Sequence, residues 1–251
     1  MKLRGWAFAA GLILTQSVAQ GQISAPVDPW KIMGNDDMIT VNGHALNIPR
    51  RFKPLVDAIG RMSMGCTGTH IGNRVVVSAG HCFNAGPQLS VNVPCGDTTI
   101  EFGVRGDREA SMVSRCVRIL GMQLNDQEGL DYVFFLVDRA PRTHLNLDFS
   151  RPVLGMPLTI FSHPFQLPLR WSPRCTLTMA HPPVISNKHM HHRCDTNPGS
   201  SGAAIINAQN LSVMGIHDGG NSTYNYGTYI WSTPLRQILI RNHIQLPQQV
   251  R

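Results

Sequence analysis

Asp195-Thr196-Asn197-Pro198-Gly199-Ser200-Ser201-Gly202 is the stretch around which this chain is organised. It is typical of a serine held in a tight turn between glycines. A serine hydroxyl is a weak nucleophile near neutral pH, so it needs a general base and backbone N–H groups directed at the oxyanion. Gly199 has no Cβ, so we expect its N–H and that of Ser201 to form an oxyanion hole. Gly-Ser-Ser-Gly runs also occur in flexible linkers, so the octet needs support from the rest of the chain.

A histidine suited to act as the general base follows a short apolar run. Val75-Val76-Val77-Ser78-Ala79 predicts a buried strand, which ends at Gly80-His81-Cys82. A disulfide through Cys82 would hold His81 rigidly at the end of this strand, as a catalytic base requires. A single histidine is more often structural or solvated, and the Ser-Ala-Gly-His-Cys context is what favours the catalytic interpretation.

A carboxylate is needed to orient the imidazole and to stabilise its charged form. Asp131 opens the apolar run 131–137, which predicts a buried strand. Many aspartates before strands only end a turn, but Asp131 fits as the third member of a His, Asp, Ser order. Asp126 lies in a polar loop and Asp138 follows the strand, so both are less suitable.

Length and composition favour a folded, β-rich chain. With 251 residues, 42% of them hydrophobic, the chain can form one large domain or two half-domains with buried cores. The 23 glycines, 17 prolines and many short apolar runs favour an all-β fold with frequent turns. The formal net charge of +7 is not concentrated in one basic block, and aromatic and basic side chains do not interleave. We therefore expect a solvated cationic surface and no nucleic-acid partner.

The N-terminus has the pattern of a secretory signal peptide. Lys2 and Arg4 precede an apolar run from Trp6 to Leu14, and Ser17-Val18-Ala19 offers small residues for cleavage. A membrane anchor is the alternative, but the run is short and has no stop-transfer pattern. We expect residues 1–19 to be removed, which leaves a secreted protein, extracellular or periplasmic, with no membrane partner.

Residues 20–31 carry two prolines and no hydrophobic periodicity, which is typical of a short pro-segment ending at Lys31. Cleavage after Lys31 would make the apolar Ile32 the new N-terminal residue.

Export makes the cysteines interpretable as disulfides, because an even number in an oxidising compartment usually pairs. Sequence proximity favours Cys66 with Cys82 most strongly, and the pairing of the other four stays open, with Cys95–Cys116 and Cys175–Cys194 as the nearest partners. Zinc binding is the competing interpretation, but the chain has no Cys-x-x-Cys pair.

His189-Met190-His191-His192 brings together imidazoles that could hold a transition metal. The cluster contains no carboxylate as a supporting partner. We therefore expect a solvated or substrate-contacting loop between Cys175 and Cys194, with no metal and no cofactor.

The order His81, Asp131, Ser201 resembles that of the chymotrypsin-like serine peptidases, as do Cys-Thr-Gly before the Val-Val-Val-Ser-Ala-Gly-His-Cys run and the later Gly-x-Ser-Gly. The resemblance extends from about Ile32 to Ile244. Within that superfamily the chain is most similar to the secreted bacterial glutamyl endopeptidases. Four segments carry this likeness: Ile32-x-Gly-x-Asp-Asp, Ser162-His163-Pro164, Asp195-Thr196-x-x-Gly199-x-Ser201-Gly202 and Gly215-Ile216-His217-Asp218-Gly219-Gly220.

The resemblance implies an all-β fold of two antiparallel six-stranded β-barrels. Residues 32–145 would form the first barrel and carry His81 and Asp131. Residues 146–251 would form the second barrel, carry Ser201 and end in a helix after Pro234, where residues 235, 238 and 239 repeat an apolar stripe.

The resemblance also implies the function: a monomeric, secreted serine endopeptidase that cleaves proteins or peptides through an acyl-enzyme. Thr196 and His217 match the positions at which the glutamyl branch binds a substrate carboxylate, so we expect Glu at P1, the residue before the scissile bond. Asp195 lies where enzymes that cleave after Arg or Lys keep a pocket carboxylate, so a basic P1 residue is the alternative. A second rival is a secreted binding protein on the same scaffold without catalysis.

One residue departs from the digestive members of the superfamily. They carry an aspartate before the nucleophile that pairs with the newly formed N-terminus, whereas this chain has Ser200. Ser200 cannot form that ion pair, so activation after Lys31 would have to work in another way.

Overall fold

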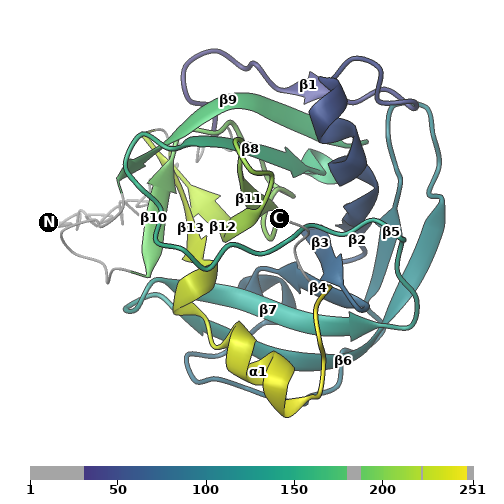
Figure 1. The fold of residues 1–251 in the computed structure, drawn as a ribbon, viewed down its shortest axis with the longest axis vertical. Helices are drawn as coiled ribbons and strands as arrows, with labels where there is room; N and C mark the ends of the chain where they lie inside the picture. The colour runs from purple at the N-terminus through teal and green to yellow at the C-terminus, as the bar shows by residue number, and fades with distance from the viewer. Residues whose placement is uncertain (1–30, 180–187, 222, 248–251) are drawn as a thin grey trace, which may run out of the picture.

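The structure, a computed structural model, describes residues 31–179, 188–221 and 223–247. The predicted signal peptide and most of the predicted pro-segment lie outside the described residues. The fold consists of two closed antiparallel β-barrels, as predicted, with the first drawn in blue to teal and the second in green to yellow (Figure 1). No helix in the described part of the chain is long and apolar enough to cross a membrane.

The first barrel closes in the order β2-β3-β4-β7-β6-β5. Its strands are β2 (Ile59–Met62), β3 (Thr67–Gly72), β4 (Val75–Ser78), β5 (Thr99–Phe102), β6 (Met112–Asn125) and β7 (Leu130–Val137). The second barrel follows the order β9-β10-β13-β12-β11-β8 and closes by pairing β8 with β9. Its strands are β8 (Pro157–Ser162), β9 (Arg170–Met179), β10 (His189–His192), β11 (Ala204–Asn207), β12 (Val213–Gly220) and β13 (Asn225–Tyr229).

Strand β1 (Ile39–Thr40) lies within the range predicted for the first barrel, but it pairs with β9 of the second. The chain reaches the first barrel through the 3₁₀ segment Arg50–Ala58, and three shorter 3₁₀ turns occur at Gly80–Phe83, Pro164–Gln166 and Ile230–Ser232. The N-terminal segment of the described chain is therefore attached to the barrel that carries Ser201.

Both faces of β7 are buried, which explains its continuous apolar sequence. Val133, Phe135 and Val137 pack inside the first barrel. Tyr132 and Phe134 belong to a second cluster that includes residues of both barrels. The strand that begins at Asp131 is thus held between the core of one barrel and the contact with the other.

The predicted C-terminal helix is confirmed as α1 (Leu235–Arg241), which follows Pro234 and lies beside β6 (Figure 1). Its buried residues are Leu235, Ile238 and Leu239. Ile238 packs on Gly121 of β6, where a Cβ would come within 2.4 Å of the isoleucine Cδ1. The second half of the chain therefore closes over the first barrel.

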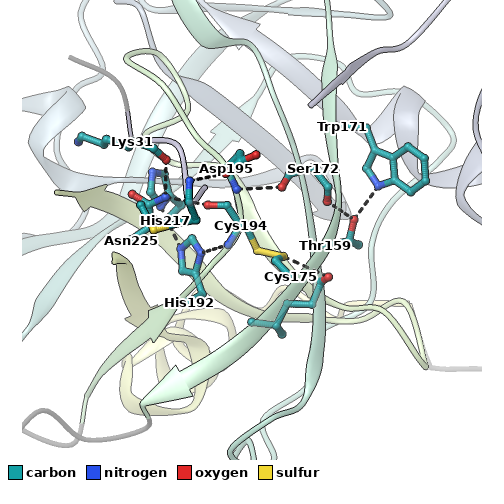
Figure 2. Close-up of a disulfide and its surroundings, with 12 residues drawn as sticks. Lys31, Thr159, Trp171, Ser172, Cys175, His192, Cys194, Asp195, His217 and Asn225 are labelled. Atoms are coloured by element: carbon teal, nitrogen blue, oxygen red, sulfur yellow. Dashed lines mark hydrogen bonds between the residues drawn. A yellow bond between two sulfur atoms is a disulfide. The ribbon is translucent and has the colours of Figure 1, made fainter. Parts of the chain in front are cut away.

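The three disulfides join the cysteines nearest in sequence, Cys66–Cys82, Cys95–Cys116 and Cys175–Cys194. The first connects the beginning of β3 to the turn that carries His81. The third lies in the second barrel and leads directly into Asp195 (Figure 2).

Candidate active site

The structure brings His81 and Asp131 into direct contact. Asp131 Oδ2 lies 2.6 Å from His81 Nδ1, and Asp131 Oδ1 accepts a hydrogen bond from the backbone N–H of His81 at 2.9 Å. The aspartate is buried, whereas the imidazole side chain is 36% exposed. Because the carboxylate accepts the Nδ1 proton, Nε2 is left as the basic nitrogen on the exposed side of the ring.

Gly80 allows the carboxylate to approach this closely. A Cβ on Gly80 would lie 2.6 Å from Gln123 O and 2.9 Å from Tyr132 O, both on the neighbouring strands. The tight contact holds the turn after β4 against the start of β7. The absence of a side chain at Gly80 therefore lets the turn pack closely enough for His81 to bond to Asp131.

The Ser201 turn docks onto the strands of the first barrel that lead to His81. Ser201 O accepts a hydrogen bond from Thr67 N–H at 2.9 Å. Gly202 has φ +85°, and a Cβ there would lie 2.0 Å from Ser78 Oγ and 2.8 Å from Ala79 N. Glycine is thus required at position 202 for both conformation and space. Through these contacts, the turn with the serine is packed against the residues just before His81.

Ser201 Oγ has one hydrogen-bond partner among the described residues, Asp218 O at 3.5 Å, and none is formed with His81. Hydrogen bonds between catalytic groups are often long or absent until substrate binds. In the same turn, the N–H groups of Gly199 and Ser201 donate to no acceptor in the described part of the chain. Both are therefore available to a substrate oxygen.

The turn that carries Gly199 packs against the segment that follows β8. Gly199 has φ +99°, and a Cβ there would lie 2.7 Å from His163 O. Phe165 N–H donates to Pro198 O at 2.6 Å, and Thr67 Oγ1 donates to Gly199 O at 2.8 Å. The Ser162-His163-Pro164 segment noted in the sequence analysis thus packs against the turn at Pro198 and Gly199.

Ser200 points into the protein interior and is fully buried. Its Oγ lies 2.9 Å from Ser162 Oγ and accepts a hydrogen bond from Asn197 N–H at 3.2 Å. The neutral Ser200 side chain therefore has hydrogen-bond partners in the interior, whereas a buried aspartate at position 200 would need a cationic partner.

The N-terminal segment bonds to Asp195 instead (Figure 2). Asp195 Oδ1 accepts a hydrogen bond from Met33 N–H at 2.6 Å, and Oδ2 accepts one from Asp37 N–H at 3.1 Å. Lys31 O accepts hydrogen bonds from Thr196 N–H and Asn225 Nδ2. Both oxygens of the Asp195 carboxylate are thus occupied by backbone 158 to 162 residues away in sequence.

His217 takes part in a buried chain of imidazoles (Figure 2). Its Nδ1 lies 3.2 Å from His192 Nε2, and His192 Nδ1 accepts a hydrogen bond from Cys194 N–H at 3.2 Å. The proton of a neutral His192 must then be on Nε2, which donates to His217 Nδ1. His217 consequently carries its own proton on Nε2, where its ring also contacts the backbone of Tyr226.

Burial keeps these two imidazoles neutral. Burial, and then the neighbouring rings His191 and His189, lower the pKa of His192 to about 3. Burial, and then the proximity of His192 and Lys31, lower the pKa of His217 well below its usual value. Thr196 Oγ1 is likewise buried and has no hydrogen-bond partner among the described residues. An unpaired buried hydroxyl costs free energy, so this site favours a ligand that accepts a hydrogen bond.

The sequence analysis missed Asp218, a second buried carboxyl group beside Asp131. Thr228 Oγ1 connects the two, since it accepts a hydrogen bond from Asp131 N–H at 2.8 Å and lies 3.1 Å from Asp218 Oδ2. Burial, and then the charge of Asp131, raise the pKa of Asp218 well above its usual value. The Gly-Ile-His-Asp-Gly-Gly pattern signalled a functional strand, but nothing in it indicated which way Asp218 points.

The prediction that His189–His192 forms a loop is wrong, because these residues form β10, which pairs with β13 and β9. Side chains alternate along a strand, so the cluster is divided between two faces. His192 contacts His217, whereas His189 and His191 line a separate pocket beside His81. His189 Nε2 also lies 3.4 Å from Asp218 Oδ2, a carboxylate partner that the sequence did not reveal.

Comparison with known families gives one match over most of the chain. Residues 66–216, which include His81, Asp131 and Ser201, match the model of the trypsin-like peptidase domain. A search of curated proteins found no match.

Solved structures of proteases share the fold at low sequence identity. A Glu endopeptidase, solved in complex with MPD, is 17% identical with a TM-score of 0.65, and the alignment covers 85% of this chain and 100% of that chain. The protease Anisep from Arthrobacter nicotinovorans is 18% identical with a TM-score of 0.58, over 74% of this chain and 95% of the other. A protease from M. tuberculosis in its active form is 14% identical with a TM-score of 0.55, over 78% and 85%.

Proposed function

Because this chain belongs to the family of trypsin-like peptidases, we propose that it is a secreted serine endopeptidase with His81, Asp131 and Ser201 as its catalytic residues. The observation that carries this proposal is the double contact of His81 with Asp131, through its ring and its backbone. A merely structural histidine would not need a buried carboxylate on one ring nitrogen and solvent on the other side.

In this mechanism Ser201 Oγ attacks the scissile carbonyl while His81 Nε2 removes its proton. Asp131 stabilises the imidazolium that forms and keeps the ring in the required orientation. The N–H groups of Gly199 and Ser201 bind the oxyanion. His81 then donates its proton to the leaving amine, and water hydrolyses the acyl-enzyme by the same route.

A free strand edge is available for the substrate backbone. The pairing of β11 with β12 ends at Ile216, with further hydrogen bonds at His217. In the described part of the chain, no strand pairs with Asp218–Gly220 on that side. An extended peptide can therefore add to this edge next to Ser201 Oγ, which is the usual way in which sheet edges bind peptides.

We expect the P1 side chain to be acidic and to contact Thr196 and His217. Thr196 Oγ1 has no hydrogen-bond partner among the described residues, so it can donate to a carboxylate. The hydrogen bonds of His192 keep the proton of neutral His217 on Nε2, where a substrate carboxylate would replace the backbone of Tyr226 as its acceptor. Asp195 is a poor partner for a basic P1 residue because both of its oxygens already accept backbone N–H groups. The arrangement thus favours Glu over Arg or Lys.

A peptide library with the P1 residue varied tests this specificity. The expected result is a kcat/KM for P1 Glu about a hundredfold above that for P1 Lys, because both oxygens of the Asp195 carboxylate already accept backbone N–H groups and would not pair with a buried ammonium group. Cleavage is read from product masses. Dominant cleavage after Arg or Lys would instead assign the specificity to Asp195 and overturn the role of His217.

The preference for Glu over Gln at P1 should increase as the pH falls. In the free enzyme the pKa of His217 is far below its usual value, so the ring is neutral at pH 7. A bound carboxylate favours the imidazolium and raises this pKa, so lowering the pH strengthens binding of Glu but not of neutral Gln. The measurement is the ratio of the two kcat/KM values between pH 8 and pH 6, in which any pH dependence common to both substrates cancels. A ratio that stays constant or falls would exclude His217 from the P1 site.

The contacts of residues 31–37 suggest how maturation would proceed. After cleavage at Lys31, Asp195 would keep its hydrogen bonds to Met33 and Asp37 and hold the new N-terminal segment on the second barrel. In this proposal, Asp195 orders the segment beside Thr196, and Ser200 needs no ion pair.

A further inference from the structure

We propose that the pocket beside His81 is a substrate subsite that selects a cationic side chain, Lys or Arg, at P2, the second residue before the scissile bond. The proposal rests on the proposed function and adds a second specificity to it. The pocket has a volume of about 560 Å³, and its wall includes His81, Asp131 and Asp218.

Its position relative to Ser201 indicates P2. Asp218 lines the pocket with its side chain, while its carbonyl oxygen lies 3.5 Å from Ser201 Oγ. In an extended peptide, successive side chains point to opposite faces. Thr196 and His217 do not line this pocket, whereas His81 does. If the P1 side chain contacts Thr196 and His217, the P2 side chain therefore points in the opposite direction, into the pocket beside His81.

The charge of the pocket favours a cation. Asp126, Asp131 and Asp218 line it, and no Lys or Arg of the described residues does. Burial raises the pKa of Asp218 well above its usual value, so the charge comes from Asp126 and Asp131, and a cation bound beside Asp218 would lower its pKa again. Glu128 and Lys188 form an ion pair with each other. Although the whole chain carries a formal charge of +7, this pocket is locally acidic. Asp126 is exposed and makes no ion pair with a described residue, so it can face an incoming ammonium or guanidinium group.

The histidines do not cancel this charge. Burial lowers the pKa of His189 to about 4 and also lowers that of His191. Both rings are therefore neutral at pH 7 and can accept hydrogen bonds. The Nε2 proton of His189 is directed at Asp218 Oδ2, so Nδ1 of the same ring is an acceptor. This atom has no hydrogen-bond partner among the described residues.

The free groups in the wall are of the kind that a cationic side chain satisfies. His189 Nδ1 and Asp218 Oδ1 are both buried and lack a hydrogen-bond partner among the described residues. Lys and Arg side chains carry only donors, so they fit two unfilled acceptors. A Glu side chain would bring further acceptors and a repulsive charge.

Aromatic rings complete the pocket. Tyr224 stacks on His191 with 3.9 Å between ring centroids and 13° between planes. Tyr226 packs on His189 with centroids 4.8 Å apart. Tyrosine faces attract Lys and Arg head groups, while the rings also cover the methylene groups of these side chains.

The test uses peptides that share P1 Glu and differ only at P2, with Lys, norleucine or Glu. For the unmodified enzyme we expect kcat/KM to be about tenfold higher for P2 Lys than for norleucine, and lower still for P2 Glu. Norleucine matches the length of the Lys stem without its charge, so the ratio isolates the cation.

Two variants identify the groups responsible. Asp126→Asn should reduce the Lys-to-norleucine ratio about threefold, because it removes one carboxylate that would face the P2 cation. Asp97→Asn, an equal change of charge at another exposed position, should leave the ratio unaltered. Tyr224→Leu should reduce the ratio, whereas Tyr224→Phe, which keeps the aromatic face, should preserve it.

The proposal is overturned if the unmodified enzyme shows no preference for P2 Lys over norleucine, or if Asp126→Asn and Asp97→Asn change the ratio equally. Failure of the proposed P1 specificity looks different: P1 Glu peptides would then be cleaved poorly whatever P2 is. In that case the same P2 series is measured with the P1 residue that the enzyme accepts, and the same criteria decide.

Discussion

Ser201→Ala should lower kcat for peptide hydrolysis by about six orders of magnitude, because in the proposed mechanism Ser201, His81 and Asp131 act as a unit and the remaining groups only bind substrate. The variant should also lose labelling by a fluorophosphonate probe, which reacts with activated serines. The Oγ of Ser201 makes only a 3.5 Å contact with Asp218 O, so its removal should leave the fold intact. Thermal unfolding and circular dichroism check that the variant remains folded.

Ser200→Ala is the matched control, since it removes a hydroxyl from the adjacent residue. Ser200 Oγ bonds to Ser162 Oγ and accepts the N–H of Asn197. Its loss should reduce the free energy of unfolding by about 1–3 kcal/mol, because two buried polar groups lose their partner. Labelling and hydrolysis should persist. Peptide hydrolysis by Ser201→Ala at the unmodified rate would refute the catalytic assignment and favour a binding protein on the same scaffold.

Asp131→Asn should lower kcat by about four orders of magnitude. In the unmodified protein, Asp131 Oδ2 lies 2.6 Å from His81 Nδ1 and accepts its proton. Asparagine keeps the size of the side chain, but an NH₂ group at the Oδ2 position cannot accept a hydrogen bond. The ring would adopt the other tautomer, with its proton on Nε2, and could no longer act as a base towards Ser201. Single-turnover kinetics with an ester substrate measure the acylation step directly.

Asp138→Asn is the control for Asp131→Asn. Asp138 follows the same strand at its far end, and its Oδ1 accepts N–H groups from Arg115 and Arg139 at 2.8 Å. An asparagine carbonyl can accept both bonds, so activity should be unaffected. Equal losses in the two variants would mean that Asp131 acts through the stability of β7, and a retained rate in Asp131→Asn would remove it from the mechanism.

The catalytic assignment could be made from sequence because each residue lies beside a local signal. His81 follows a short run of valines at the end of β4, and Asp131 is the second residue of the apolar strand β7. Positions 199 and 202 require glycine, with φ of +99° and +85°. Strand periodicity and turn residues depend on neighbours in the chain, so they can be interpreted without coordinates.

The specificity could not be decided in the same way. Asp195 was compatible with a pocket for basic residues until its carboxylate was found bonded to Met33 and Asp37. The sequence predicts that His192 lies in a histidine-rich loop, yet in the structure it contacts His217, 25 residues away. These contacts depend on the pairing of β10 with β13, and of β13 with β12, which no local pattern encodes.

By itself, the sequence determined that this protein is a β-rich, disulfide-containing chain with three well-spaced candidates for catalysis, because strand patterns, turn glycines and cysteine spacing are local properties. Only the tertiary structure decided which carboxylates face the active site, where the N-terminal segment binds, and that an acidic pocket lies beside His81. The physical reason is that hydrogen-bond partners and burial are set when the two barrels close and pack together. A side chain such as Asp218 acquires its partners, and its raised pKa, only from residues that are distant in the chain.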